Sequence, residues 1–298
     1  MTTMQTLSNP TDDPRRKKLP VANPHALGVL SIHLDGGVCR VGCEFCYLGA
    51  REASIASPED PAIPKNLDLK MLEDVLSRLD YAEVAVAISE PAAPMLGPLR
   101  AIVRAATARG KPVAITTTAS VIASERGVVE GVSRVNLSVD PRKGPVAPRW
   151  VDHVARMARA PGREVALIVS LVNPAFAESL LAGNLRALVE LENVDKVALS
   201  ALKPPPPWCD RAFWLSALAR LAPVLEKHLD RRLFLDCYVA ARILGLGGCP
   251  ARPDLSPQNE FRACVYQKAA DFVFTGAADL EARLRDFTAP AACPFEIY

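Results

Sequence analysis

The sequence predicts an α/β protein: a partial TIM barrel of the (β/α)6 type whose strands run parallel, followed by a cysteine-containing C-terminal extension. Two observations predict this fold. From about residue 27, short apolar runs rich in β-branched residues alternate with longer amphipathic segments. Most of the short runs begin roughly 20–35 residues apart, the spacing of βα units with right-handed crossovers. Six or seven such units favour a curled barrel over a flat, doubly wound sheet.

The expected strands are nearly continuous apolar runs, as in parallel sheets that are buried on both faces. They cover Leu27–Leu34, Glu83–Ile88, Val113–Thr118, Arg134–Val139, Val165–Leu171, Val197–Leu202 and Leu233–Val239. The helices between them follow the 3.6-residue period, and Leu69, Leu72 and Leu76 share one face of the first helix. A further helix is expected near residues 211–229, before the last strand.

Three segments are expected along the chain. Residues 1–22 form a disordered tail that ends in basic residues, because they show no apolar periodicity. Residues 23–205 form the barrel core. Residues 206–298 form an extension that completes the barrel and holds either an auxiliary metal site or buried thiols. With 298 residues, the core is large enough to fold without disulfides.

The charge is balanced, with 35 basic against 33 acidic residues and a net charge of +2. This balance gives no global field that would indicate nucleic acid or an anionic membrane as partner. No apolar run reaches the roughly 18–20 residues of a membrane span, and residues 1–20 lack the apolar stretch of a signal peptide. We therefore expect a cytoplasmic protein that binds neither membrane nor nucleic acid.

The eight cysteines are unevenly distributed: three lie within residues 39–46 and five between residues 209 and 293. In a long chain without an export signal, thiols are more often metal ligands, catalytic groups or buried small residues than disulfides. Cys39, Cys43 and Cys46 have a C-x3-C-x2-C spacing and lie in the long connection after the first expected strand. Such loops, at the carboxyl ends of the strands, carry the chemistry of β/α barrels.

Three thiolates at this spacing can surround one face of an iron–sulfur cubane, and Gly36, Gly37 and Gly42 let the backbone turn tightly around it. Three ligands leave one iron open to bind another group, as in catalytic metal sites. The alternatives are a zinc site, a structural cluster or buried thiols. Zinc sites usually pair two C-x2-C hooks, and this segment has one.

With Phe45 in the aromatic position before Cys46, the motif resembles the signature of the radical S-adenosylmethionine superfamily. The resemblance covers roughly residues 27–203. It implies that Cys39, Cys43 and Cys46 each bind one iron of a [4Fe–4S] cluster, while the amino and carboxylate groups of S-adenosylmethionine chelate the fourth. It also implies that reductive cleavage of the sulfonium gives a 5′-deoxyadenosyl radical, which abstracts hydrogen from a substrate.

The end of the second expected strand fits this resemblance. Residues 88–91 read Ile-Ser-Glu-Pro and resemble the superfamily's Gly-Gly-Glu-Pro motif, with Ser89 where glycine is commoner. In that reading Ser89 and Glu90 bind the cofactor, and the Glu90 carboxylate accepts from the methionine ammonium group. A strand-ending turn with a solvated glutamate is the alternative.

Polar residues also mark the fourth and fifth expected strands. Alternation places Asn136, Ser138 and Asp140 on one face, pointing into the barrel. The resemblance implies contacts to the cofactor ribose there, first from Ser138 and then from Asp140; a polar edge that caps the next loop is the alternative. Ser170 and the run Thr116–Thr118 either line the cofactor or substrate pocket or serve only as strand residues.

The C-terminal extension carries Cys249, Cys264 and Cys293, with Cys237 as a fourth candidate ligand. Glycine or proline next to Cys249 and Cys293 provides turns that ligand cysteines often need. However, the extension has no C-x2-C hook, and free cysteine is also a common buried residue. A second iron–sulfur cluster and buried thiols both remain open.

The leading prediction is therefore an enzyme that uses S-adenosylmethionine and a [4Fe–4S] cluster for radical chemistry on an organic substrate, either a small metabolite or a peptide. Such an enzyme needs an electron donor such as flavodoxin or ferredoxin as partner. The alternative is a non-catalytic iron–sulfur or zinc-binding module that acts as a sensor or scaffold. That module would need a fourth protein ligand at the open iron.

Overall fold

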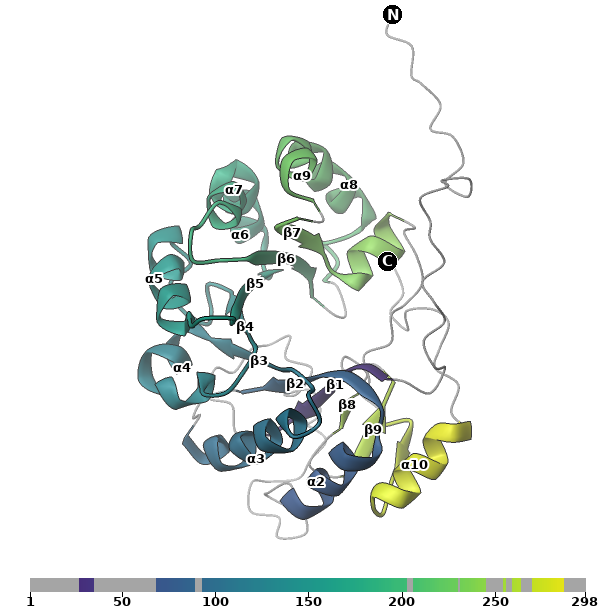
Figure 1. Cartoon of the computed structure of the whole chain (residues 1–298). Helices are drawn as coiled ribbons and strands as arrows, with labels where there is room; N and C mark the ends of the chain where they lie inside the picture. Colours follow the sequence, from purple (N-terminus) through teal and green to yellow (C-terminus); the bar gives the residue numbers. More distant parts are fainter. Residues whose placement is uncertain are drawn as a thin grey trace, which may run out of the picture.

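The strands of the chain form a curled sheet, and the helices lie on its convex side (Figure 1). The structure, a computed structural model, describes residues 27–34, 68–88, 93–202, 206–229, 231–244, 254–255, 259–263 and 270–286. The strands are β1 Leu27–His33, β2 Tyr81–Ala87, β3 Val113–Thr118, β4 Arg134–Val139, β5 Glu164–Leu171, β6 Lys196–Ala201, β7 Leu233–Leu235, β8 Asp254–Leu255, β9 Glu260–Arg262 and β10 Phe272–Val273.

The helices follow the strands in alternation. They are α2 Leu69–Arg78, α3 Leu96–Thr107, α4 Ala119–Ser124, α5 Pro148–Ala158, α6 Pro174–Ser179, α7 Leu185–Val189, α8 Arg211–Arg220, α9 Ala222–His228 and α10 Ala277–Asp286. Short 3-10 turns lie at η2 Ala93–Met95 and η3 Arg126–Val129, and π-helical turns at η4 Leu180–Asn184 and η5 Val239–Ile243.

The sheet order confirms a partial barrel of parallel βα units. Strands β1 to β7 lie side by side in chain order, and every neighbouring pair among them is parallel. On the other side of β1, the extension adds β8, which is parallel to β1, and then β9 and β10, which are antiparallel. Helix α10 of the same extension packs against α2 (Figure 1). The carboxyl ends of β1 to β7 therefore meet along one edge of the curled sheet.

The seventh strand is shorter than predicted, which corrects the expectation of a strand over Leu233–Val239. It ends at Leu235, because the Asp236 carboxylate accepts from the Val239 amide at 2.9 Å and caps the π-helical turn that follows. The expected helix near residues 211–229 is two helices. Pro223 lies at the start of α9, and because proline has no amide hydrogen it interrupts the hydrogen-bond series of α8.

The core lies between the sheet and its helices. Alternate residues of each strand are buried against the helices; in β4 these are Val135, Leu137 and Val139. They meet apolar helix faces such as Val151, Val154, Ala155 and Ala158 of α5. This single apolar layer on the convex side holds the barrel together, because burying such side chains contributes roughly 25 cal/mol per Å². No helix among the described residues combines the length and the apolar character that a membrane crossing needs.

Polar residues at four helix starts are used as caps. The side chains of Asp68, Thr118, Asn173 and Asp210 each accept a backbone amide in the first turn of α2, α4, α6 and α8, respectively. Such caps typically contribute about 1 kcal/mol each. These four groups are therefore explained by local structure.

Candidate functional site

The concave face of the sheet is the candidate site, and the strand register identifies its side chains. Residues paired across parallel strands point to the same side of the sheet. Since the residues that alternate with Asn136 and Ser138 are buried under helices, these two lie on the concave face. The register extends this face to Ser31, His33, Ala85, Ala87, Ala114, Thr116, Thr118, Ala166, Ile168, Ser170, Ala198, Ser200 and Phe234.

The concave face is lined mainly by small or polar side chains. A closed β/α barrel fills its interior with layers of bulky branched residues. From the middle of the strands to their carboxyl ends, alanine, serine and threonine predominate, and His33, Ile168 and Phe234 are the larger members there. Such a face presents small side chains, hydroxyl groups and an amide group to the inside of the curl. The arrangement is suited to a ligand instead of a self-filled core.

The carboxyl end of β4 carries two hydrogen-bonded pairs on this face. The Asn136 amide Nδ2 donates to Thr116 Oγ1 of β3 at 3.3 Å. Two residues further along β4, Ser138 Oγ accepts from the Lys143 ammonium at 2.8 Å. Ser138 also lines a small hollow with Gly144 and other residues of the loop after β4. Ser138, the first candidate for the ribose contact, therefore lies at the carboxyl end of the concave face.

Asp140, the second candidate, is buried directly after β4. Its carboxylate accepts from Nε and Nη2 of Arg142, at 2.9 and 2.5 Å, and from the Arg142 backbone amide at 2.9 Å. The Asp140 side chain is only 1% exposed, whereas that of Arg142 is 28% exposed. The structure therefore assigns the Asp140 carboxylate to the shape of its own loop, with the guanidinium between it and solvent.

A second polar group lies at the ends of β5, β6 and β7. Ser170 is paired in register with Ser200, and Ser200 Oγ donates to Asp236 Oδ2 at 2.7 Å. The same carboxylate oxygen accepts from the Ala201 amide at 3.0 Å. Asp236 thus ties the ends of β6 and β7 together beside the predicted candidate Ser170. Sequence reasoning missed Asp236; its signal is an acidic residue that directly follows a strand at the carboxyl edge.

The threonine run at the end of β3 divides among three roles. Thr116 lies on the concave face and is bonded to Asn136. Thr117 is 2% exposed and faces the helices, as alternation requires. Thr118 caps α4. Of the three, Thr116 is the one that the structure places where a ligand can reach it.

Several predicted site residues lie outside the described residues. They are Cys39, Cys43, Phe45, Cys46, Ser89, Glu90, Cys249, Cys264 and Cys293. Their neighbours along the chain are described: β1 ends at His33, six residues before Cys39, and β2 ends at Ala87, two residues before Ser89. Both segments therefore leave the sheet at its carboxyl edge.

Two cysteines of the C-terminal half are described. Burial raises the pKa of the Cys209 thiol to about 12, although Trp214 partly offsets this effect, so the thiol is protonated at neutral pH. Cys237 is half-buried and directly follows Asp236. Within the described ranges, no three histidine, cysteine or acidic side chains are grouped closely enough to hold a metal ion. Cys209 is therefore a buried structural thiol.

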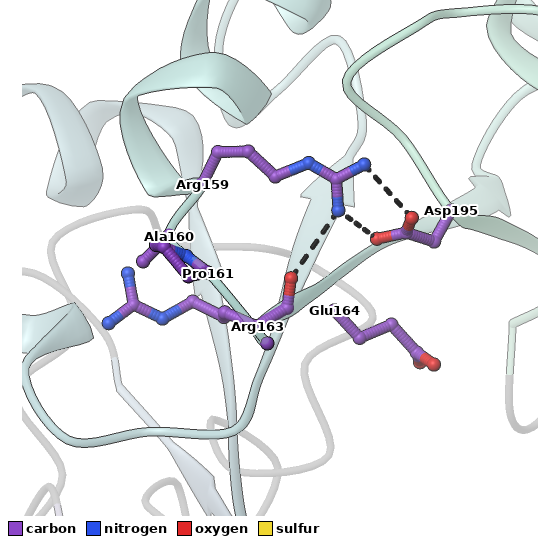
Figure 2. A pocket seen from close by; sticks show the side chains of 7 residues that line it. Arg159, Ala160, Pro161, Arg163, Glu164 and Asp195 are labelled. Atoms are coloured by element: carbon purple, nitrogen blue, oxygen red, sulfur yellow. Dashed lines mark hydrogen bonds and ion pairs between the residues drawn. The ribbon is translucent and has the colours of Figure 1, made fainter.

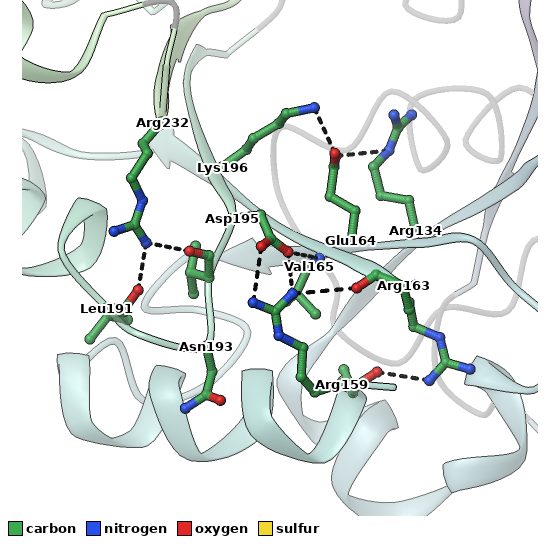
Figure 3. A network of polar contacts seen from close by, with 12 residues as sticks. Arg134, Arg159, Arg163, Glu164, Val165, Leu191, Asn193, Asp195, Lys196 and Arg232 are labelled. Atoms are coloured by element: carbon green, nitrogen blue, oxygen red, sulfur yellow. Dashed lines mark hydrogen bonds and ion pairs between the residues drawn. The ribbon is translucent and has the colours of Figure 1, made fainter. Parts of the chain in front are cut away.

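At the opposite end of the barrel, charged residues bind one another. The Arg134 guanidinium contacts Glu83 at 2.6 Å. Arg134 also contacts Glu164 at 3.9 Å, and Lys196 contacts Glu164 at 2.6 Å (Figure 3). We call these four residues the charge ladder. They lie at the amino ends of β2, β4, β5 and β6, and their two positive and two negative charges compensate.

A surface hollow also lies at this amino end, lined by residues 159–164 and Asp195 (Figure 2). Its charged groups have structural partners. Arg159 binds Asp195, and Arg163 donates to the backbone carbonyls of Val129, Val132 and Ala158 at 2.6, 3.1 and 2.8 Å. Burial lowers the pKa of Arg163. Active sites of β/α barrels lie at the other end, and the arginines of this hollow are already bound within the chain.

Comparison with known proteins supports the fold. No family model matches the sequence, and none of the curated proteins matches it. Among solved structures, SuiB of Streptococcus suis, determined bound to S-adenosylmethionine, matches with a TM-score of 0.61 and 12% sequence identity. The match covers 89% of this chain and 65% of SuiB, so the chain spans less than two thirds of that protein.

A weaker match is a probable sugar kinase protein from Rhizobium etli CFN 42, with 10% identity and 89% coverage of both chains. Its TM-score of 0.26 is too low to indicate a common architecture. At 12% identity, the likeness to SuiB is one of fold. It confirms the partial TIM barrel that the sequence predicts.

Proposed function

We propose that this chain is a radical S-adenosylmethionine enzyme that holds a [4Fe–4S] cluster on Cys39, Cys43 and Cys46. One observation carries the proposal: the cysteine triplet follows the first strand of a fold that is shared with a protein solved bound to S-adenosylmethionine. The segment that holds the triplet leaves β1 at the carboxyl edge of the sheet, where β/α barrels carry their sites.

The donor set fits the cluster. Thiolates are the ligands that iron–sulfur clusters favour, and three of them leave one iron for the amino and carboxylate groups of S-adenosylmethionine. When bound, the cluster supplies the electron that splits the sulfonium into methionine and a 5′-deoxyadenosyl radical. The chain's own residues then have to hold the cofactor, exclude water and orient the substrate.

Strand ends of this chain are suited to hold the rest of the cofactor. Ser89 and Glu90 lie two and three residues after the end of β2, and a carboxylate there is a suitable acceptor for the methionine ammonium. Ser138 presents a hydroxyl on the concave face of β4, in reach of a ribose bound along that face. Ser170 offers a second hydroxyl from β5.

The substrate and the partners are part of the proposal. The small side chains of the concave face leave room for an organic substrate, a small metabolite or a peptide segment, beside the cofactor. The reaction needs one electron from a donor such as flavodoxin or ferredoxin. Cys249, Cys264 and Cys293 are candidate ligands of a second cluster in the extension.

The test is the release of 5′-deoxyadenosine from anaerobically reconstituted protein that is given dithionite and S-adenosylmethionine. We expect release from the wild type and none from Cys43→Ala. Cys209→Ala is the matched control and should retain release, because that thiol is buried and protonated. Metal analysis should give about four irons per chain for one cluster and about eight for two.

Two results would contradict the proposal. Unchanged 5′-deoxyadenosine release from Cys43→Ala would mean that the triplet does not hold the catalytic cluster. Stoichiometric zinc without iron, together with no release from the wild type, would instead favour the non-catalytic metal-binding module.

A further inference from the structure

The loop after β4 has one more positive than negative side chain. The Asp140 carboxylate is bound by the Arg142 guanidinium through two nitrogens, so those two charges offset each other. Lys143 follows in the same loop, and among the residues that the structure describes no carboxylate lies within ion-pair distance of its ammonium. Within the described part of the chain, the loop therefore presents one cation without a carboxylate partner.

The position of this cation is fixed by the concave face. The Lys143 ammonium donates to Ser138 Oγ at 2.8 Å, and Ser138 lies on that face in register with Thr118 and Ile168. Lys143 is half-buried, so its charge is only partly solvated. A partly desolvated ammonium whose described partner is a neutral hydroxyl gains from an anion, because charge-assisted hydrogen bonds are roughly twice as strong as neutral ones. Ser138 accepts from Lys143 and still has its own O–H to donate.

The proposed function assigns the negative charge of the cofactor to another place. The proposed function, on which this step rests, places the carboxylate of S-adenosylmethionine on the iron, in the segment after β1. Strand β4 lies three positions from β1 in the sheet, roughly 14 Å away along it at about 4.8 Å per strand. The adenosyl part of the cofactor, which the resemblance brings to Ser138, carries no negative charge.

We propose that Lys143, whose ammonium is held in place by Ser138, binds a carboxylate or phosphate group of the substrate, so that the substrate is an anion. The site holds that group at the carboxyl edge of β4, beside the adenosyl part of the cofactor. Lys143 is the charge that selects the substrate, and Ser138 positions the Lys143 ammonium. The compensated Arg142–Asp140 pair keeps the neighbouring backbone in place.

The test uses inorganic phosphate and succinate as probes, titrated calorimetrically into the reconstituted holoprotein saturated with S-adenosylmethionine. We expect saturable binding of at least one probe to the wild type. Lys143→Met should weaken it roughly tenfold or more, and Lys143→Arg should retain it within about threefold, because the charge is kept. Lys227→Met is the matched control. Lys227 is an exposed lysine at the end of α9 that binds Glu190, and the variant should bind the probes as the wild type does.

The affinity for S-adenosylmethionine shows whether Lys143 binds an anionic group of the substrate or the carboxylate of the cofactor. We expect it to be the same for Lys143→Met and the wild type. A loss of cofactor affinity as large as the loss for the probes would assign the cation to the cofactor's own carboxylate and overturn the proposal. Equal probe binding by the wild type and Lys143→Met, or no saturable binding to the wild type, would also overturn it. Failure of the wild type to release 5′-deoxyadenosine bears on the proposed function alone.

Discussion

The two ends of the barrel strands use their polar residues differently. At the amino ends, the charge ladder of Glu83, Arg134, Glu164 and Lys196 pairs its charges within the chain. Arginines there also bind backbone carbonyls where helices end: Arg163 does so at α5 and Arg232 near α7 (Figure 3). At the carboxyl ends, small hydroxyl side chains face the open side of the curl.

This difference separates stability from function within one sheet. The last turn of a helix leaves backbone carbonyls without partners, and each βα unit brings one such turn to the amino edge. A positive side chain there satisfies the carbonyls and also interacts favourably with the helix dipole. The carboxyl edge meets helix starts instead, which the caps Thr118, Asn173 and Asp210 satisfy. Ser138, Ser170 and Lys143 at this edge take no part in these caps.

Replacing a small residue of the concave face with a larger one should distinguish ligand binding from stability most clearly. Ala87 lies on that face at the end of β2, next to Thr116 in the register, whereas Ala155 of α5 is fully buried against the sheet. We expect Ala87→Leu to weaken binding of S-adenosylmethionine at least tenfold while the free energy of unfolding changes by less than about 0.5 kcal/mol. Ala155→Leu should lower that free energy by about 1–3 kcal/mol through overpacking.

Cofactor binding is measured by equilibrium dialysis with the reconstituted protein, and stability by urea unfolding. A large loss of stability in Ala87→Leu would show that the concave face is a packed core. Unchanged cofactor affinity in that variant would show that the ligand does not lie along β2.

Removing an arginine from the amino edge should affect stability alone. The three carbonyls that Arg163 binds would lose a charged, partly buried donor in Arg163→Ala. We expect a loss of about 3 kcal/mol in the free energy of unfolding, measured in urea. Arg156→Ala is the control, because Arg156 is exposed and its described partner is His153; it should change stability by less than about 0.5 kcal/mol. A loss in the control as large as that in Arg163→Ala would mean that the carbonyl contacts do not matter.

The fold could be predicted from the sequence because parallel strands leave a strong local signal. Strands β3 and β4 have the predicted bounds, since a buried strand of β-branched residues ends where polar residues begin. The prediction failed where tertiary contacts decide. Strand β7 ends before Asp236, whose carboxylate accepts from Ser200 and the Ala201 amide of β6 as well as from the Val239 amide. The two contacts to β6 depend on where β6 and β7 meet in space.

The candidate site could be predicted only in part. Alternation alone identifies Asn136 and Ser138 as neighbours on one face. It does not show that Asp140 is bound by Arg142, or that Lys143 reaches back to Ser138, because both depend on the path of the loop after β4. The assignment of Cys39, Cys43 and Cys46 as ligands stays a prediction from spacing and resemblance.

The amino edge should also show an acid-sensitive contribution to stability through Asp195. Burial alone would raise the pKa of this carboxyl, but hydrogen bonds from Arg159 and the Val165 amide, at 2.9 and 2.8 Å, outweigh it, and the pKa is lowered. A lowered pKa in the folded state means that the stabilisation is complete above the unfolded pKa of about 3.9 and is lost as the pH falls through the folded value. Because the side chain is 34% exposed, we expect Asp195→Asn to cost less than about 1 kcal/mol at pH 7. Urea unfolding at pH 7, 5 and 3 should show wild type and variant converging at the lowest pH. A difference that stays constant or widens on acidification would mean that the carboxylate charge contributes nothing to this edge.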